Sequence, residues 1–177
     1  MPGTGSTCME SLAAILAAAP QGIDVIGLSS LFGKSTGNIG IHLAILVEPY
    51  LSYIMDGTKT IESRFSKNKV APYKRVKKGD AILLKRSGGP IIGCCEVAEA
   101  MFFQIDPGVL LALKEEHGRQ IRAPDEFWKE KESSSYVTLL KIRGVVPVLP
   151  GIAIAKNDQR GWIVLRSNPG ATLDAAW

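Results

Sequence analysis

The sequence predicts an α+β protein: a small, closed or half-closed β-barrel of mixed or antiparallel strands, flanked by helices. Five or six short segments have the alternating or β-branched pattern of strands, and two or three have a helical pattern. These segments do not alternate in the regular β-α order of a doubly wound sheet. A chain of 177 residues, 46% of them hydrophobic, is long enough to fill the core of one such domain.

The expected elements follow from turn residues and hydrophobic spacing. Strands are expected over residues 41–47, 60–66, 81–85, 91–103, 133–142 and 161–166. Helices are expected to begin at Pro49, Pro107 and Pro124, because proline is favoured at the first helical position. Gly57 and Gly118 are expected to end the first two helices, since glycine readily adopts the left-handed conformation that stops a helix.

The two ends of the chain differ in composition from the middle. Residues 1–40 form an extension rich in Ala, Gly and Ser, which we interpret as a short Ala-rich helix or loosely ordered arm followed by a linker. Residues 41–167 form the main domain, and residues 168–177 are expected to be a flexible tail. The apolar run 12–19 has no basic residue before it, so a secretory signal is not expected.

Cysteine and histidine usage argues against disulfides and metal. The three cysteines include the adjacent pair Cys94–Cys95, which sits in an apolar run and indicates reduced residues in a buried strand. The two histidines, His42 and His117, are far apart and are expected to be bystanders without a metal site. We therefore expect an intracellular protein, cytoplasmic or nuclear in a eukaryote, with no cofactor. No apolar run approaches the roughly 20 residues of a membrane helix, so no membrane partner is expected.

Basic residues are concentrated in one stretch of the chain. Between Lys59 and Arg86 there are ten Lys or Arg and two acidic residues, a local charge of +8, whereas the whole chain carries +4. Such a segment favours an anionic partner, and we expect RNA or a nucleoside-type ligand. The alternative is a solvated run of lysines that contributes only solubility. The sequence gives no expectation for the oligomeric state.

The stretch from Gly57 to Arg64 places several chemically active side chains at one junction. The helical pattern ends on Gly57, and strand alternation begins at Thr60. Alternation puts Thr60, Glu62 and Arg64 on one face of the strand, beside the amine of Lys59 at its start. A carboxylate between an amine and a guanidinium can bind a ligand or move a proton. The alternative is a surface strand with a local ion pair.

Several features in this order resemble the ASCH domain family (activating signal cointegrator homology). The family signature is Gly-x-Lys-x-x-Glu-x-Arg, and all of its fixed positions are present in residues 57–64. Other matching features are Glu48-Pro49-Tyr50, Gly79-Asp80 and Gly93. The resemblance covers about residues 41–166. It implies a PUA-like β-barrel with a cleft lined by the motif, in a superfamily associated with RNA.

Members of the family that this chain resembles have different activities. Some are small hydrolases that remove the acyl group of N4-acetylated cytidine. In these, the motif lysine is held to be catalytic, which implies that role for Lys59. They carry Thr where this chain has Glu62. Others bind or cleave RNA. The cleaving type uses a tyrosine six positions before the lysine, which matches Tyr53, and a later serine, which corresponds to Ser133, Ser134 or Ser135.

We first expect a protein that binds RNA or a nucleotide or nucleoside ligand in a basic cleft. In this hypothesis Lys59 and Arg64 contact phosphate, Glu62 accepts a hydrogen bond from a base or ribose hydroxyl, and Tyr53 or another aromatic residue stacks on a base. Thr60 belongs to the same ligand-binding face. Salt-sensitive attraction would come from a basic connection that follows the motif strand. Its candidate residues are Lys67, Lys69, Lys74 and Arg75.

The alternative is a small hydrolase or ribonuclease that uses Lys59, Glu62 and Tyr53. A lysine base requires a pKa lowered from about 10.4 towards about 7–8 by burial or positive neighbours. Arg64 would lower the pKa of Lys59, and Glu62 would raise it. A third class is an interaction module in which Glu62 and Arg64 form only a structural pair. A shared cleft favours a ligand, and a flat barrel wall favours this third class.

Overall fold

The computed structural model describes residues 5–20, 22–32, 37–155 and 159–169, with side chains described from residue 8 onwards. Helices are α1 (Gly5–Ala17), α2 (Val25–Ser30), α3 (Tyr50–Met55), α4 (Pro107–Ile121) and α5 (Asp125–Lys131). Strands are β1 (Ile23–Asp24), β2 (Ile41–Leu46), β3 (Ile61–Ser66), β4 (Ala81–Arg86), β5 (Ile91–Gln104), β6 (Tyr136–Ile152), β7 (Ile154–Ala155) and β8 (Trp162–Arg166).

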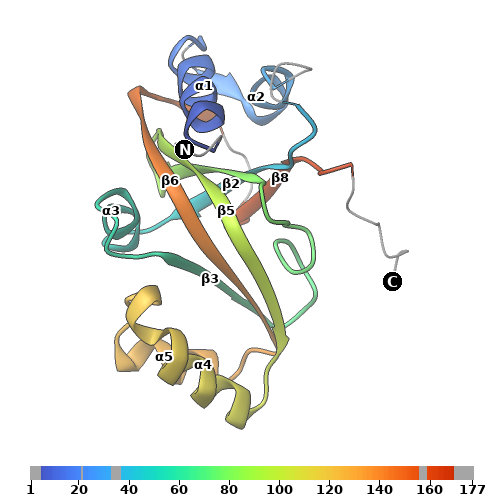
Figure 1. Cartoon of the computed structure of the whole chain (residues 1–177), viewed down its shortest axis with the longest axis vertical. Helices are drawn as coiled ribbons and strands as arrows, with labels where there is room; N and C mark the ends of the chain where they lie inside the picture. The colour runs from blue at the N-terminus through green and yellow to red at the C-terminus, as the bar shows by residue number, and fades with distance from the viewer. Residues whose placement is uncertain (1–4, 21, 33–36, 156–158, 170–177) are drawn as a thin grey trace.

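Six strands form one curled sheet, which makes a half-barrel with helices around it (Figure 1). The strand order is β3-β6-β5-β4-β2-β8. β2 and β4 are parallel, and all other neighbours in this sheet are antiparallel. The predicted α+β class, with a mixed sheet and flanking helices, is therefore confirmed. A separate two-stranded sheet pairs β1 with β7.

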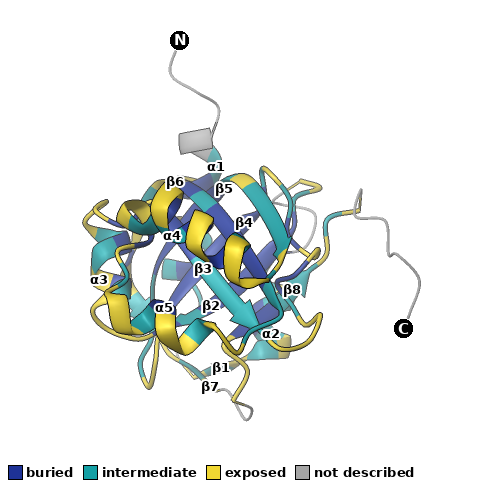
Figure 2. Ribbon diagram, turned by 90° about the horizontal axis from the view of Figure 1, so that it is seen from below, coloured by how far each residue is buried: buried dark blue, intermediate teal, exposed yellow. Residues whose placement is uncertain are grey.

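The two longest strands, β5 and β6, carry helices α4 and α5 in the connection between them. These helices lie beyond the C-terminal end of β5 and the N-terminal end of β6, next to β3 (Figure 1). Their apolar sides pack on the sheet through Leu113, Ile121 and Trp128, which share a core cluster with Ile61 and Val137. Seen from below, the outer faces of both helices are largely exposed, β3 beside them is mostly half-buried, and β4 deeper in the sheet is largely buried (Figure 2). The connection thus forms a wall beside the motif strand.

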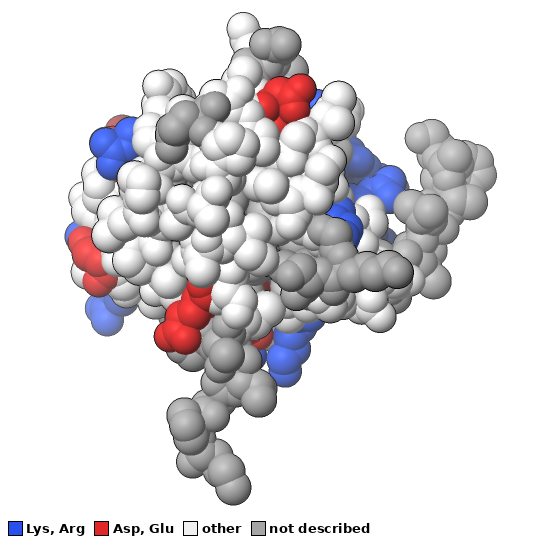
Figure 3. All heavy atoms as spheres, turned by 90° about the horizontal axis from the view of Figure 1, so that it is seen from above, with Lys and Arg blue, Asp and Glu red and all other residues white. Residues whose placement is uncertain are grey.

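The N-terminal segment contributes to the main core. α1 places Met9, Leu12 and Leu16 in a cluster with residues of β2, β4, β5 and β6, and each of the three is at most 1% exposed. The segment expected to be a linker contains α2 and buries Leu28 and Phe32 in the same cluster. The first segment was expected to be either a short Ala-rich helix or a loosely ordered arm, and the structure has the helix. The face over α1 and α2 carries few charged side chains (Figure 3).

Glycine predicted one helix end and not the other. Gly57 follows α3 with a φ of +79°, as expected for a helix stop. α4 continues past Gly118 to Ile121 and ends on Arg122, a non-glycine residue with a φ of +56°. The prediction that Gly118 ends this helix was wrong. Leu113, His117 and Ile121 continue the buried face, and this tertiary packing extends the helix by one turn.

Buried polar groups hold the centre of the sheet to the C-terminal segment. Asp80 accepts hydrogen bonds from the backbone N–H groups of Gly40 and Lys77 and from the side chain of Asn168. Its Oδ2, which also accepts the hydrogen bond from Lys77, lies 3.2 Å from Nε2 of His42, which is fully buried. His42 is therefore a structural residue and not a bystander. The predicted tail begins with this anchored asparagine, and residues 170–177 lie outside the described part of the chain.

Cys94 and Cys95 lie in β5 and are fully buried. Both are free thiols, as is the half-buried Cys8. Burial, with a smaller contribution from Cys8, raises the pKa of Cys94 to about 12. A thiol this hard to ionise is a poor nucleophile. This agrees with the packing role that the apolar run predicted.

Candidate functional site

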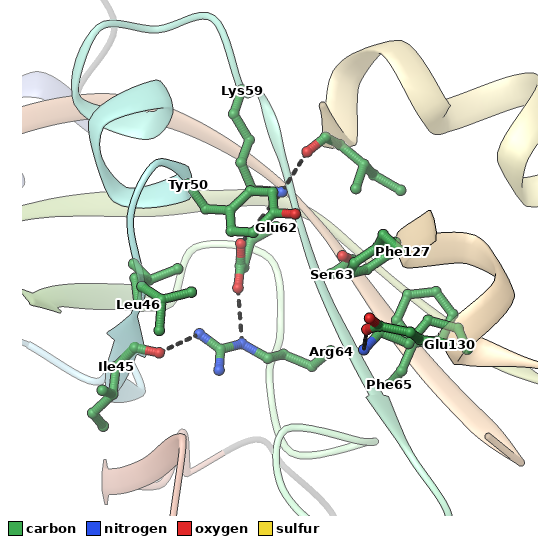
Figure 4. A pocket seen from close by; sticks show the side chains of 13 residues that line it. Ile45, Leu46, Tyr50, Lys59, Glu62, Ser63, Arg64, Phe65, Phe127 and Glu130 are labelled. Atoms are coloured by element: carbon green, nitrogen blue, oxygen red, sulfur yellow. Dashed lines mark hydrogen bonds and ion pairs between the residues drawn. The ribbon is translucent and has the colours of Figure 1, made fainter. Parts of the chain in front are cut away.

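A pocket of about 420 Å³ opens where α3 passes into β3 (Figure 4). We call it the Lys59 pocket. Its walls come from the end of β2, the start of α3, the strand β3, the last residue of α4 and the helix α5. Its lining residues are Ile45, Leu46, Val47, Tyr50, Lys59, Glu62, Ser63, Arg64, Phe65, Ile121, Phe127, Glu130 and Lys131. The motif therefore faces a hollow, as expected for a ligand site and unlike a flat barrel wall.

Glu62 lies between two cationic side chains in this pocket. Its Oε2 is 3.5 Å from Nζ of Lys59, and its Oε1 is 2.8 Å from Nε of Arg64 (Figure 4). Lys59 is 3% exposed and Glu62 is 5% exposed. The structure thus brings together the amine, carboxylate and guanidinium of the motif. Because they are largely shielded from water, their mutual attraction is stronger than that of a surface pair.

Lys59 also holds the end of helix α4. Its Nζ donates a hydrogen bond of 2.8 Å to the carbonyl oxygen of Ile121, the last residue of that helix. The neighbouring backbone N–H of Thr60 donates to the carbonyl of Gln120 at 3.1 Å. The last carbonyls of a helix lack partners within the helix. The start of the motif strand therefore caps α4 and fixes it against the pocket.

The ionisation of Lys59 is set by opposing influences. Burial of the amine lowers its pKa, the neighbouring Glu62 carboxylate raises it, and the Arg64 guanidinium lowers it again. The net direction is downward from the ordinary value of 10.5. Burial is the largest influence, because an ammonium group loses hydration that one nearby carboxylate does not fully replace. The amine is thus easier to deprotonate than that of a surface lysine.

Arg64 closes one side of the pocket and ties three strands together. Its two terminal nitrogens donate to the carbonyl oxygens of Gly161, at 3.1 Å, and Ile45, at 3.0 Å. The guanidinium carbon lies 5.3 Å from the centre of the Trp162 ring. These two hydrogen bonds use two of the five N–H groups of the guanidinium, and the contact of its Nε with Glu62 is an ion pair. Arg64 is both a structural link between β3, β2 and β8 and a donor to the pocket.

Three aromatic side chains line the pocket, Tyr50, Phe65 and Phe127, and none of them was predicted as a site residue. The Tyr50 ring centre lies 5.6 Å from Nζ of Lys59 and 6.4 Å from the ring centre of Phe127. Burial, followed by the nearby Glu130, raises the pKa of Tyr50. Tyr50 entered the sequence analysis only as part of a feature shared with the family, and Phe127 was not among the expected site residues. Only the folded α4–α5 connection brings Phe127 to this pocket.

Other predicted site residues lie outside the Lys59 pocket. Tyr53 does not line it, and its ring lies 4.0 Å below the guanidinium carbon of Arg122. Thr60 is exposed and also does not line it. The exposed residues of the β3–β4 connection are likewise separate from this pocket, namely Lys67, Lys69, Lys74 and Arg75. Ser133, Ser134 and Ser135 lie before β6 and do not line it either.

The charges of the pocket are nearly balanced. Glu62 and Glu130 face Lys59, Arg64 and Lys131, so the pocket alone is not strongly basic. Within the described residues, no group of three or more His, Cys, Asp or Glu side chains could hold a metal ion. No helix in this part of the chain is long and apolar enough to cross a membrane.

The ASCH domain family model matches residues 45–148. The chain belongs to the ASCH domain family. The match contains every residue that lines the Lys59 pocket, from Ile45 in β2 to Lys131 in α5. Helix α1, His42 and Trp162 lie outside the family match. Their packing against this ASCH domain therefore comes from segments outside the matched region.

Solved ASCH structures are similar to this chain at low sequence identity. ASCH from Zymomonas mobilis is 16% identical over 60% of this chain and 69% of its own, with a TM-score of 0.48. A serine-to-alanine mutant of ASCH from the same organism is 15% identical over 73% of this chain and 90% of its own, with a TM-score of 0.56. The second comparison supports the fold of this ASCH domain and nothing finer. No curated protein sequence matches the chain.

Proposed function

We propose that this ASCH-domain chain binds single-stranded RNA and holds one nucleotide in the Lys59 pocket. The observation that carries the proposal is the buried Lys59–Glu62–Arg64 cluster, which lies in a pocket with the aromatic rings of Tyr50 and Phe127. Single-stranded RNA offers unstacked bases, ribose hydroxyls and phosphates, and these groups pair with aromatic, carboxylate and cationic side chains respectively.

Each side chain has a role that its contacts allow. The unused N–H groups of Arg64 and the third N–H of an ionised Lys59 are donors for phosphate or hydroxyl oxygens. The carboxylate of Glu62 has acceptor positions beyond those used by its two cations, and these suit a ribose hydroxyl or a base amino group. Tyr50 replaces Tyr53 as the proposed stacking residue, because only Tyr50 lines the pocket.

Because the charges of the Lys59 pocket are nearly balanced, the proposal assigns the electrostatic attraction of RNA to another part of the domain. The exposed β3–β4 connection carries Lys67, Lys69, Lys74 and Arg75, and it supplies sequence-independent attraction to the phosphate backbone. In this proposal the pocket selects a nucleotide and the connection holds the strand. Affinity then depends on salt through the connection and on nucleotide chemistry through the pocket.

Fluorescence anisotropy with a labelled single-stranded RNA, measured at several salt concentrations, tests the proposal. For single strands, the slope of log K against log salt is about −0.7 per phosphate neutralised. Replacing Lys67 and Lys69 with Ala should therefore reduce the slope by up to about 1.4. Lys59→Met should weaken binding and, because it removes one cation, should reduce the slope by no more than about 0.7. Lys129→Ala, an exposed lysine on α5 outside the Lys59 pocket, is the matched control. Absence of salt-dependent binding would rule the proposal out.

The second candidate function is hydrolysis, either of an acylated cytidine or of an RNA phosphodiester. The lowered pKa of Lys59 is the observation that favours it. A neutral amine keeps two N–H groups, which can serve the Ile121 carbonyl and Glu62, and its lone pair then remains for proton abstraction. With the amine ionised, Lys59 would stabilise developing negative charge, and Glu62 would transfer the proton.

Product analysis by mass spectrometry separates these candidates. The protein is incubated with N4-acetylcytidine and, separately, with a short RNA. Release of acetate or of RNA fragments that disappears in Lys59→Met would support hydrolysis. If RNA binds and neither product forms, only the binding function remains supported.

A further inference from the structure

A second, smaller pocket lies on the other side of Arg64. Its volume is about 190 Å³, and Arg64 and Phe65 line both this pocket and the Lys59 pocket. We call it the Thr138 pocket. Its other lining residues used below are Ser66, Tyr73, Thr138 and Trp162. It is less than half the size of the Lys59 pocket, which suits one planar ring system better than a whole nucleotide.

The hydroxyl of Thr138 has no hydrogen-bond partner. Thr138 is 1% exposed, and its Oγ1 is fully buried. Within the described residues, the other buried side-chain atom without a hydrogen bond is Nε of Arg64, which has Glu62 as an ion-pair partner. Thr138 lies opposite Arg64 in the β3–β6 register, so both side chains project from the same face of the sheet. A buried unsatisfied hydroxyl that lines a pocket indicates a polar group of a ligand or a water.

Aromatic rings form the walls of the same pocket. Trp162 lies beneath the Arg64 guanidinium, and Tyr73 is fixed by Tyr136 and Phe102, with ring centres 5.0 and 5.8 Å away. Rings that are already packed lose little freedom when they stack on a ligand. Stacking on a base needs a flat face and not a particular hydrogen-bond pattern.

The basic connection borders this pocket and not the Lys59 pocket. Tyr73 belongs to the connection, and Nζ of Lys74 lies 6.0 Å from its ring centre. Nζ of Lys69 lies 5.7 Å from the ring centre of Tyr136, which packs behind Tyr73. A polyanion attracted to the connection is thus led to the Thr138 pocket. Arg64, between the two pockets, still has N–H groups for a phosphate that joins two nucleosides.

We propose that the Thr138 pocket is a second base subsite, which takes the base of the nucleotide next to the one held in the Lys59 pocket. In this arrangement the base stacks within the aromatic walls, Oγ1 of Thr138 hydrogen-bonds to its edge, and Arg64 contacts the bridging phosphate. The inference rests on the proposed RNA-binding function and adds to it the recognition of a dinucleotide step.

Calorimetry with the full chain tests the subsite. The probes are the four nucleoside 5′-monophosphates, the four homodinucleotides, and dinucleotides in which either base is replaced by an abasic ribose. At least one homodinucleotide should bind about tenfold or more tightly than its mononucleotide, as expected for one extra stacked base. The abasic probe that empties the Thr138 pocket should lose that gain. Thr138→Val should weaken dinucleotide binding about two- to tenfold through the lost hydrogen bond, and leave mononucleotide binding unchanged.

Ser30→Ala removes an exposed hydroxyl on α2 and serves as the matched control, with no effect on either probe. The wild-type comparison of probes carries the test even if a variant folds poorly. Dinucleotides that bind no more tightly than mononucleotides would overturn the second subsite and leave the proposed function standing. A gain that persists in both abasic probes would assign it to phosphate alone and overturn the subsite. Failure of every probe to bind would overturn both proposals.

Discussion

Trp162 connects Arg64 of the pocket to the buried polar centre of the sheet. Its ring lies 5.3 Å from the Arg64 guanidinium carbon, and its Nε1 lies 3.3 Å from Nδ1 of His42. Indole N–H can only donate, so Nδ1 accepts and Nε2 carries the proton that faces Asp80. The orientation of Arg64 thus depends on a series of contacts that runs from Asp80 through His42 to Trp162.

Arg64→Lys should destabilise the domain although it keeps the charge beside Glu62. A lysine cannot reproduce the planar contacts with Gly161 and Ile45. Loss of charged hydrogen bonds to these carbonyls should lower the free energy of unfolding by about 1.5–3 kcal/mol. Urea unfolding measures it. A variant as stable as the wild type would show that the two carbonyl contacts contribute nothing net.

Asp80→Asn should remove part of the acid sensitivity of the domain. Burial raises the pKa of Asp80, but hydrogen bonds from His42, Asn168, Lys77 and Gly40 outweigh it, and the net direction is downward from 3.8. The ionised carboxylate therefore stabilises the fold above pH 3.8, and this contribution is lost as the pH falls through the lower folded-state pKa. When unfolding is measured from about pH 6 downwards, the free energy of unfolding of Asp80→Asn should decline less steeply than that of the wild type. Parallel curves would contradict the assignment.

Lys59→Met should change how stability depends on alkaline pH. The folded-state pKa of Lys59 lies below its ordinary value of 10.5, so between these two values the unfolded chain binds more protons. Stability therefore rises with pH through that window in the wild type. The methionine variant keeps the apolar stem and should lack this rise. Denaturant midpoints for both proteins across the window give the difference, and equal slopes would show that the amine titrates normally.

Thr138→Val should stabilise the ligand-free protein. The hydroxyl is buried and unpaired, and an unsatisfied group of this kind costs about 1–3 kcal/mol. Valine has nearly the same shape and suits a strand. For a domain of this size, the melting temperature should rise by about 2–4 °C for each kcal/mol gained. An unchanged melting temperature would mean that solvent already satisfies the hydroxyl.

Leu12→Ala should show that helix α1 belongs to the core. Leu12 is fully buried in the cluster that α1 shares with the sheet. Truncation of a buried leucine lowers the free energy of unfolding by about 2–5 kcal/mol. Ala14→Ser, on the exposed side of the same helix, should change it by less than about 0.5 kcal/mol. If both substitutions had equally small effects, α1 would be peripheral.

The sequence predicted most strands of the main sheet, because their patterns are local, but the strand expected over residues 133–142 is β6, Tyr136–Ile152, which continues ten residues further because it pairs with β5 along most of its length. Residues 81–85 and 91–103, for example, became β4 and β5 with at most one residue of difference at each end. The end of α4 was predicted wrongly, because its last turn depends on packing with Trp128 and Val137 and not on a stop residue. Helix α1 was left undecided for a related reason, since alanine-rich sequence does not show which surface will bury it.

The candidate site was predicted in part. Lys59, Glu62 and Arg64 lie within one motif, so spacing alone placed them near one another. Tyr53 was preferred because it matches the tyrosine of the RNA-cleaving type in the family resemblance. Tyr50 and Phe127 were missed, because only the folded structure shows which side of α3 lines the pocket and which side chain of α5 reaches it. Thr138 had no signal in the sequence, since an unpaired hydroxyl exists only relative to its folded neighbours.

By itself the sequence determined the family, the mixed fold class and the cluster of ions at the start of the motif strand. These are encoded by short-range spacing, which survives in any conformation that keeps the local pattern. Only the tertiary structure decided that Lys59 is buried, that helices α4 and α5 form one side of its pocket, and that Arg64 also lines a second pocket. Burial, desolvation and unmet hydrogen bonds arise from residues distant in the chain, so they are properties of the packed molecule.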